Sequence, residues 1–175
     1  ASQLKGHAEF FDDFCHSIVL FEGEDPIHQL LTTLKKGGSF YEVPNLMFQD
    51  KGEVRINKER VELRFEEIPS PTFDYLSPYP ILPVLQSRGC YWGKCTFCTH
   101  SFIYGHRYGK QRTEQMVDEL TALSEKYQTQ YFTFSDEAMS PHALNDISEL
   151  MIERGTDIRA LALLKFEKVM DETLF

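Results

Sequence analysis

Basic residues, long apolar runs and cysteines are all scarce in this sequence of 175 residues. Lys and Arg together number 18 against 27 Asp and Glu, which gives a formal net charge of -9. Binding to nucleic-acid phosphates is dominated by Lys and Arg, so this charge balance argues against a nucleic-acid-binding surface. No apolar stretch approaches the roughly 20 residues that cross a bilayer. We therefore expect a small-molecule or peptide substrate, no nucleic acid and no membrane.

The four cysteines are too few and too unevenly spaced for a disulfide framework. Cys15 stands alone, whereas Cys90, Cys95 and Cys98 lie within nine residues. Three thiols in one short, glycine-containing segment suit metal ligation in a reducing compartment, so we expect a cytoplasmic protein. Cys15 is most simply a buried small residue.

The first 80 residues predict two short organised pieces. Residues 10–34 indicate helix, strand, helix, and the apolar run 17–21 is typical of a buried parallel strand. Asp25 is the expected N-cap of the second helix, with Gly37 after its end. In residues 39–80, alternating apolar residues around Asp50-Lys51-Gly52 predict a hairpin, and the later prolines predict an extended linker.

The remainder predicts alternating strands and helices. Residues 81–86, 131–134 and 159–164 read as strands, and helices are expected to begin at Thr113 and Ser140. This order predicts an α/β fold with a parallel βαβαβ unit. Loops at the carboxyl ends of such strands usually carry the chemistry. Both the cysteines and Ser135-Asp136-Glu137 follow strands in this way.

The cysteine segment reads Cys90-Tyr91-Trp92-Gly93-Lys94-Cys95-Thr96-Phe97-Cys98. An iron-sulfur cube needs four ligands, so three cysteines leave one iron open to another ligand. A structural zinc site with His100 or His106 as the fourth ligand is the alternative, and three inert core thiols are a second one.

This segment resembles the radical S-adenosylmethionine (SAM) signature, which is Cys, three residues, Cys, two residues, Cys, with an aromatic before the last cysteine. Phe97 occupies the aromatic position. The spacing departs from the signature because four residues separate Cys90 from Cys95. The preceding strand and Ser87-Arg88-Gly89 resemble the subgroup whose barrel follows a cobalamin-binding domain.

The resemblance implies a partial radical SAM (β/α) barrel, preceded by a terminal βα unit of a Rossmann-like cobalamin-binding domain and a linker. The implied divisions are 1–38 for the cobalamin-binding-like unit, 39–80 for the linker with a small hairpin, and 81–175 for the barrel part. Because such a barrel has about six strands and three are visible, the chain is expected to be a fragment of a longer protein.

The resemblance also implies ligands. Cys90, Cys95 and Cys98 would hold a [4Fe-4S] cluster, and Asp136 and Glu137, beside Ser135, would bind the amine of SAM. Phe97 would lie near the adenine, and Lys165 could meet the SAM carboxylate. The alternatives are ordinary ones: the two acids cap a helix or are solvated, Phe97 is an apolar anchor, and Lys165 is solvated. The basic group Arg107, Lys110 and Arg112 could contact an anionic substrate or cap neighbouring helices. No side chain is assigned as a catalytic acid, base or nucleophile.

The function implied by the resemblance is generation of a 5'-deoxyadenosyl radical from SAM, with an external electron donor. Methyl transfer with cobalamin in the parent protein is one outcome, and rearrangement or oxidation are others. A zinc-stabilised binding module and a degenerate scaffold that binds no SAM are the alternatives.

Overall fold

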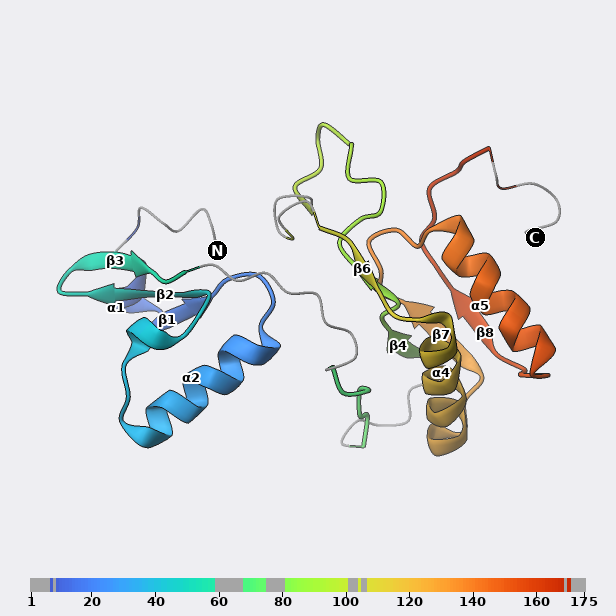
Figure 1. Ribbon diagram of the computed structural model, residues 1–175, viewed down its shortest axis with the longest axis horizontal. Helices are drawn as coiled ribbons and strands as arrows, with labels where there is room; N and C mark the ends of the chain where they lie inside the picture. The colour runs from blue at the N-terminus through green and yellow to red at the C-terminus, as the bar shows by residue number, and fades with distance from the viewer. Residues whose placement is uncertain are drawn as a thin grey trace. The chain divides into compact units, whose positions relative to one another are not determined.

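The computed structural model describes His7 and residues 9–58, 68–74, 81–100, 104, 107–168 and 170. Chain contacts divide it into two compact units, Ala1–Leu63 and Arg64–Phe175 (Figure 1). Each unit has its own apolar core, and each is described by itself.

The first unit is a three-stranded antiparallel sheet with helices. Its elements are α1 (Glu9–Asp13), β1 (Ser17–Val19), α2 (Glu24–Lys36), the 3-10 helix η2 (Phe40–Glu42), β2 (Leu46–Asp50) and β3 (Glu53–Ile56). The predicted helix-strand-helix order and the hairpin are confirmed. Lys51 and Gly52 form the two-residue hairpin turn, both with positive φ, as a tight turn between twisted strands requires.

Three details of the first unit differ from expectation. β1 pairs antiparallel with β2, Ser17 opposite Phe48, so the prediction of a parallel strand is wrong. The hairpin expected within the 39–80 linker supplies that neighbouring strand, and it therefore belongs to the sheet of this unit. The N-cap of α2 is Gly23, while Asp25 lies inside the helix and accepts a hydrogen bond from Gln29 Nε2 at 2.6 Å.

The second unit contains the predicted parallel βαβαβ arrangement. Its sheet has the order β4 (Leu82–Val84), β7 (Tyr131–Phe134), β8 (Arg159–Leu161), and both pairings are parallel. The crossovers are α4 (Thr113–Tyr127) and α5 (Pro141–Glu153), which lie side by side (Figure 1). A separate two-stranded ribbon joins β5 (Ser87–Arg88) to β6 (Gly109–Lys110).

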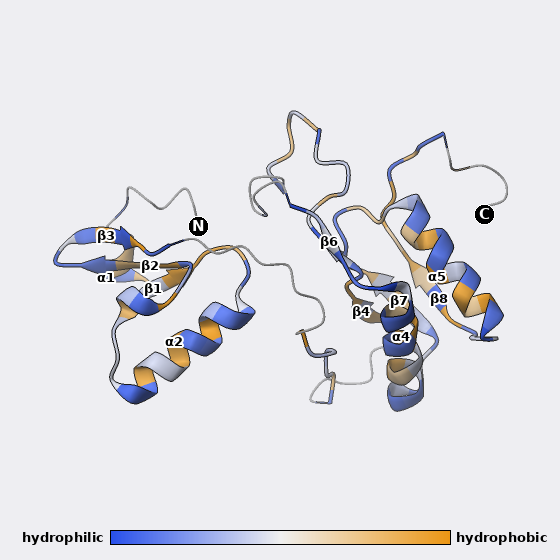
Figure 2. Ribbon diagram, viewed as in Figure 1, coloured by the Kyte–Doolittle hydropathy of each residue, from blue (hydrophilic) through white to orange (hydrophobic). Residues whose placement is uncertain are grey.

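The helices of this unit bury one face of the sheet. Figure 2 shows apolar stripes on α4 and α5, and their inward residues fill one core with the sheet: Leu82, Val84, Met116, Val117, Leu120, Leu123, Phe132, Phe134 and Ile147. Residues that alternate with these point to the opposite face. Tyr131 and Leu161 on that face are 47% and 65% exposed. The described part of the unit therefore covers the parallel sheet with helices on one side.

The helix boundaries follow local chemistry. Ser140 caps α5 by accepting a hydrogen bond from the Ala143 amide at 3.2 Å, with Pro141 in the first turn, as predicted. The N-cap of α4 is Arg112, whose side chain makes no capping bond, and Thr113 is instead the first helical residue.

Candidate functional site

The cysteines occupy a loop closed by its own stem. β5 and β6 pair antiparallel, Ser87 with Lys110 and Arg88 with Gly109, so the chain leaves the sheet and returns over this ribbon. Just below it, the Gln111 amide donates to the Gln86 carbonyl at 2.8 Å. The loop therefore rises from a fixed base beside the carboxyl end of β4.

Gly89 allows the two sides of the stem to close. Its φ is +76°, and a Cβ there would overlap the carbonyl oxygen of Arg107 and lie 3.5 Å from the Cβ of Tyr104. Only glycine fits both the backbone angle and the space. The lead-in to the first cysteine is thus shaped by the opposite strand of the loop.

The three loop cysteines are free thiols that water can reach. Cys90 and Cys98 are partly exposed and Cys95 is exposed, and the Cys98 amide donates to the Cys95 carbonyl at 3.2 Å in a tight turn. Across the described residues, no three His, Cys, Asp or Glu side chains converge closely enough to hold one ion. The loop supplies a donor set of three soft thiolates, which is the set that iron-sulfur clusters and zinc both take.

Asp136 is built into the base of the loop. It is 2% exposed and accepts hydrogen bonds from the Gln86 amide at 3.1 Å and from the Ser87 hydroxyl. Burial raises the pKa of Asp136, although these two bonds oppose the shift. Its carboxyl group therefore joins the end of β7 to the start of the cysteine stem.

The two carboxylate oxygens of Glu137 have different surroundings. Its side chain is 15% exposed, Oε1 lies 3.7 Å from His100 Nδ1, and Oε2 is buried with no hydrogen-bond partner among the residues that the structure describes. A buried carboxylate oxygen without a donor is costly unless a ligand supplies one. Of the two predicted acids, Glu137 is the one with a carboxylate oxygen left without a donor in the described part of the chain.

The other predicted SAM contacts lie at the same end of the unit. Phe97 is 88% exposed in the cysteine loop. Ser135 is exposed at the end of β7, where its amide donates to the Val84 carbonyl at 2.8 Å. It lines a pocket of about 270 Å³ together with Arg88, Gln111 and Glu119.

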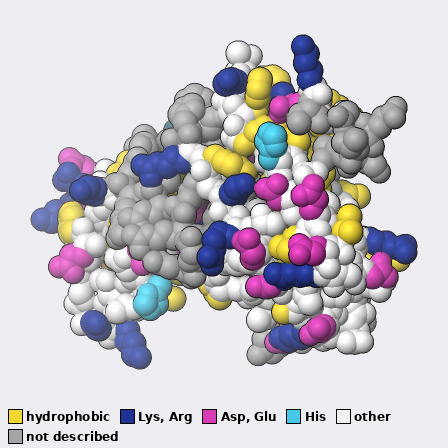
Figure 3. Space-filling model, turned by 45° about the vertical axis from the view of Figure 1, so that its right-hand side comes forward, with side chains coloured by type: hydrophobic (Ala, Val, Ile, Leu, Met, Phe, Trp, Pro, Cys, Tyr) yellow, Lys and Arg dark blue, Asp and Glu magenta, His cyan; other side chains and the backbone are white. Residues whose placement is uncertain are grey.

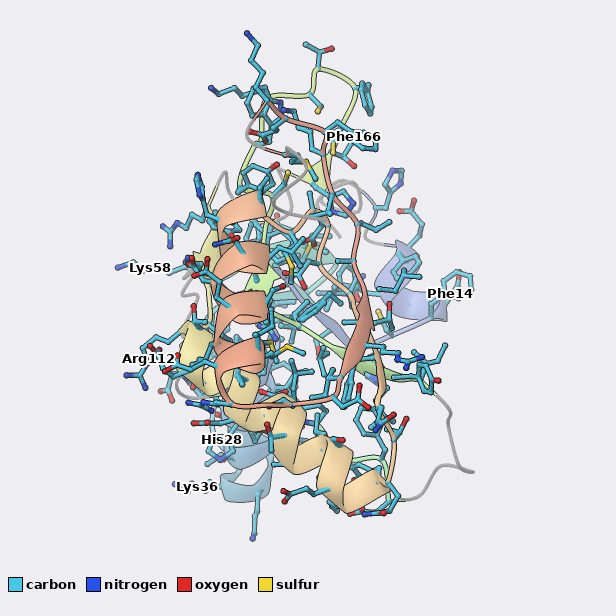
Figure 4. The ribbon with its side chains drawn as sticks, turned by 90° about the vertical axis from the view of Figure 1, so that its right-hand side faces the viewer. Phe14, His28, Lys36, Lys58, Arg112 and Phe166 are labelled. Carbon is cyan, nitrogen blue, oxygen red and sulfur yellow. The ribbon has the colours of Figure 1, made fainter. Side chains whose placement is uncertain are left out.

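Lys165 contacts the cysteine loop directly. Its ammonium lies 3.7 Å from the centre of the Trp92 ring and 3.3 Å from Glu167 Oε1. Glu167 accepts a hydrogen bond from the Tyr91 hydroxyl at 2.5 Å, and this bond lowers the pKa of Glu167. Burial raises the pKa of Tyr91 well above its usual range. Phe166 stands between Lys165 and Glu167 in the sequence, and Figure 4 shows it at the end of the unit that carries the loop.

Sequence reasoning missed Tyr91, Trp92 and Glu167 as parts of the site. The sequence signal for them was the pair of aromatic residues, Tyr91 and Trp92, in the spacer between the first two cysteines. Large aromatic side chains pack against other groups, so this pair indicated that another segment contacts the loop. The structure describes three of the other candidate residues, which are Arg107, Lys110 and Arg112. His106 lies outside the described residues. On the face shown in Figure 3, acidic and basic side chains are interspersed. Within the described residues, no helix has the length and apolar character needed to cross a membrane.

No protein-family model matches the chain. Two curated relatives do. An uncharacterised methyltransferase of Pyrococcus horikoshii is 29% identical over an alignment of 152 positions, and the alignment covers 81% of this chain and 33% of that protein. A 4'-phospho-dehydrooxetanocin synthase of Priestia megaterium is 35% identical over 120 residues, 64% of this chain and 16% of that protein. The chain therefore spans a third or less of these relatives.

Two solved enzymes have similar structures. The cobalamin-dependent SAM radical enzyme OxsB aligns with 97% of this chain and 26% of its own, at a TM-score of 0.72 and 24% identity. The radical SAM methyltransferase TsrM of Kitasatospora setae aligns with 91% of this chain and 35% of its own, at a TM-score of 0.67 and 19% identity. The resemblance to cobalamin-dependent radical SAM enzymes is thus confirmed at the level of the fold, as a mixed α/β structure with a parallel sheet.

Proposed function

We propose that this chain is the cluster-binding part of a radical SAM enzyme, in which Cys90, Cys95 and Cys98 ligate a [4Fe-4S] cluster. When bound, such a cluster supplies the electron that splits SAM into methionine and a 5'-deoxyadenosyl radical. One observation carries the proposal. The cysteine loop and the partly unsatisfied Glu137 meet at the carboxyl edge of one parallel sheet, with His100 and Glu137 3.7 Å apart.

Different residues around the loop would bind different parts of SAM. Glu137 accepts hydrogen bonds from the ammonium group, because its Oε2 has no donor within the described residues. Phe97 offers an exposed ring for the adenine, and Ser135 and Lys165 offer polar contacts at the same edge. Asp136, fully engaged with Gln86 and Ser87, fixes the loop and leaves ligand binding to Glu137.

We also propose that β4, β7 and β8 are strands of a (β/α) barrel. Parallel sheets are normally covered on both faces. The face opposite α4 and α5 exposes Tyr131 and Leu161, and in a barrel this face lines the interior, with the active site at the carboxyl ends of the strands. The substrate would be a small molecule or a peptide, and the electron would come from an external donor.

The names of the relatives support a cobalamin-dependent methyl transfer in the parent protein. OxsB is cobalamin-dependent, and two of the similar proteins are named methyltransferases. In the first unit, the α/β order fits the end of a cobalamin-binding domain, while the antiparallel pairing of β1 departs from a Rossmann-like strand. Free thiols fit a reducing compartment such as the cytoplasm.

The decisive experiment is anaerobic reconstitution with iron and sulfide, followed by EPR of the dithionite-reduced chain with and without SAM. We expect a reduced-cluster signal that changes when SAM is added. Cys98→Ala should abolish it, whereas Cys15→Ala, in the first unit, should not. Colourless protein with one tightly bound zinc would refute the proposal and favour the zinc-stabilised module.

A second pair of variants tests the SAM contact. Glu137→Gln should keep the cluster signal and lose its response to SAM, because a neutral amide binds an ammonium group poorly. Glu153→Gln, an exposed acid at the end of α5, is the matched control and should respond as the parent chain does. An unchanged SAM response in Glu137→Gln would refute the role of Glu137.

A further inference from the structure

The four residues between Cys90 and Cys95 are held from a distant part of the chain. Residues 165–167, here called the clamp segment, follow β8 and lie against this spacer. Lys165 covers the Trp92 ring at 3.7 Å, and Glu167 receives the Tyr91 hydroxyl at 2.5 Å. Lys165 and Glu167 also pair with each other at 3.3 Å, so the two contacts form one connected group.

These contacts are of the stronger kinds available near a protein surface. A hydrogen bond to an ionised carboxylate is about twice as strong as a neutral one. A cation over an indole ring is attracted by the ring quadrupole, and more so where water is partly excluded. The Lys165 and Glu167 side chains are only 35% and 25% exposed. Lys94 lies 4.9 Å from the same indole ring, so two cations meet Trp92, and Glu167 pairs with one of them, Lys165.

The spacer needs such support because it is one residue longer than the usual signature. It contains Gly93, at φ +57°, and its neighbour Cys95 is exposed. Bringing three thiols to one metal group requires this segment to adopt one conformation, and ordering each residue costs about 1–2 kcal/mol of backbone entropy. Anchoring Tyr91 and Trp92 removes part of that cost before any metal arrives.

We propose that Lys165 and Glu167 are positioning residues that hold the Tyr91–Trp92 part of the cysteine loop and thereby raise the affinity of the three thiolates for their metal group. The inference rests on the proposed function only for the identity of that group. The same clamp segment would act on zinc or on an iron-sulfur cluster. Its effect is therefore measurable with a simple metal ion.

Trp92 is the only tryptophan of the chain, so tryptophan fluorescence reports on the surroundings of this one ring. In the metal-free chain, Lys165→Ala should raise the acrylamide quenching constant of Trp92 about twofold, because the ring loses its cover. Lys165→Arg should restore protection, since a guanidinium also binds an indole face. Lys168→Ala, an exposed lysine three residues later, is the matched control and should change nothing.

Anaerobic titration with Co²⁺, followed by its thiolate charge-transfer absorption, measures the effect on the cysteines. Glu167→Gln and Tyr91→Phe should each weaken Co²⁺ binding about tenfold, and the double variant should be no weaker than either single one. Such non-additivity isolates the Tyr91–Glu167 bond from a general loss of structure. Cys98→Ala, which lacks one of the three proposed thiolate ligands, gives the absorption expected when Co²⁺ is not bound by all three cysteines.

The outcomes separate the two proposals. Unchanged Co²⁺ affinity in Lys165→Ala and Glu167→Gln would overturn the clamp, even if quenching of Trp92 rises. Weakened Co²⁺ binding in the variants, combined with no SAM-responsive cluster signal in the parent chain, would uphold the clamp and refute the radical SAM function. Additive losses in the double variant would overturn the role assigned to the hydrogen bond.

Discussion

Replacing Gly89 with alanine tests how tightly the stem of the cysteine loop is closed. Two separate costs arise. An L-residue at a φ of +76° loses about 1–2 kcal/mol in the left-handed region. The new Cβ also overlaps the Arg107 carbonyl oxygen, and such overpacking costs about 1–3 kcal/mol as the stem shifts. We expect Gly89→Ala to lower the free energy of unfolding by about 2–5 kcal/mol.

Gly155→Ala is the matched control within the same unit. Gly155 has a similar φ of +65°, but a Cβ there would meet nothing within 4 Å. This variant should suffer only the backbone cost, partly offset by about 0.4–1 kcal/mol from the stiffer unfolded chain. The difference between the two variants therefore isolates the contact with Arg107.

Urea unfolding measures both variants. Trp92 fluorescence reports on the loop and circular dichroism on the helices, and coincident transitions would support a two-state treatment. Equal losses in Gly89→Ala and Gly155→Ala would refute the reasoning, because they would show that the two sides of the stem do not press on residue 89. A lower midpoint in Trp92 fluorescence alone would show that the stem opens independently of the core.

Three further predictions concern the second unit. Leu120→Ala, at a fully buried position of α4, should cost about 2–5 kcal/mol in urea unfolding, against less than about 0.5 for exposed Leu163→Ala. Asp74 accepts hydrogen bonds from Lys126 and Tyr127, and these bonds lower its pKa. The stabilising effect of Asp74 should therefore be lost as the pH falls through that lowered pKa. Because the Phe73 amide donates to the Tyr127 hydroxyl, faster hydrogen exchange of this amide would show the loss. Burial raises the pKa of Asp136, so its contribution to stability should be largest below the ordinary pKa of Asp and decline as the pH rises through the raised folded pKa. The free energy of unfolding of Asp136→Asn, measured across the same rise in pH, should lack this decline.

Local sequence patterns predicted the elements of the second unit well. Met116, Val117, Leu120 and Leu123 recur at helical spacing, and all four are buried in α4. Helix periodicity depends on neighbours within one turn or two, so the sequence contains the necessary information. The order of strands and helices then restricts the pairing to a parallel sheet.

Contacts between distant segments were harder to predict. The apolar run of β1 fits either strand direction, and its antiparallel partner β2 was assigned to a linker. Asp136 and Glu137 are adjacent acids with the same local pattern. Asp136 accepts hydrogen bonds from Gln86 and Ser87, whereas one oxygen of Glu137 has no partner among the described residues. Such differences depend on which hydrogen-bond donors the folded chain brings near each carboxylate. The periodicity of apolar residues in the sequence does not contain this information.

The separation of Tyr91 from Glu167 along the chain also orders events during synthesis. The two residues are 76 positions apart. At about 5–20 residues per second, ribosomes need about 4–15 s to make the intervening stretch. During that interval the three thiols exist without the residues that hold their loop, and they are open to oxidation. If the cysteines bind a metal group as we propose, its loading should follow, and not precede, the emergence of β8 and the residues just beyond it.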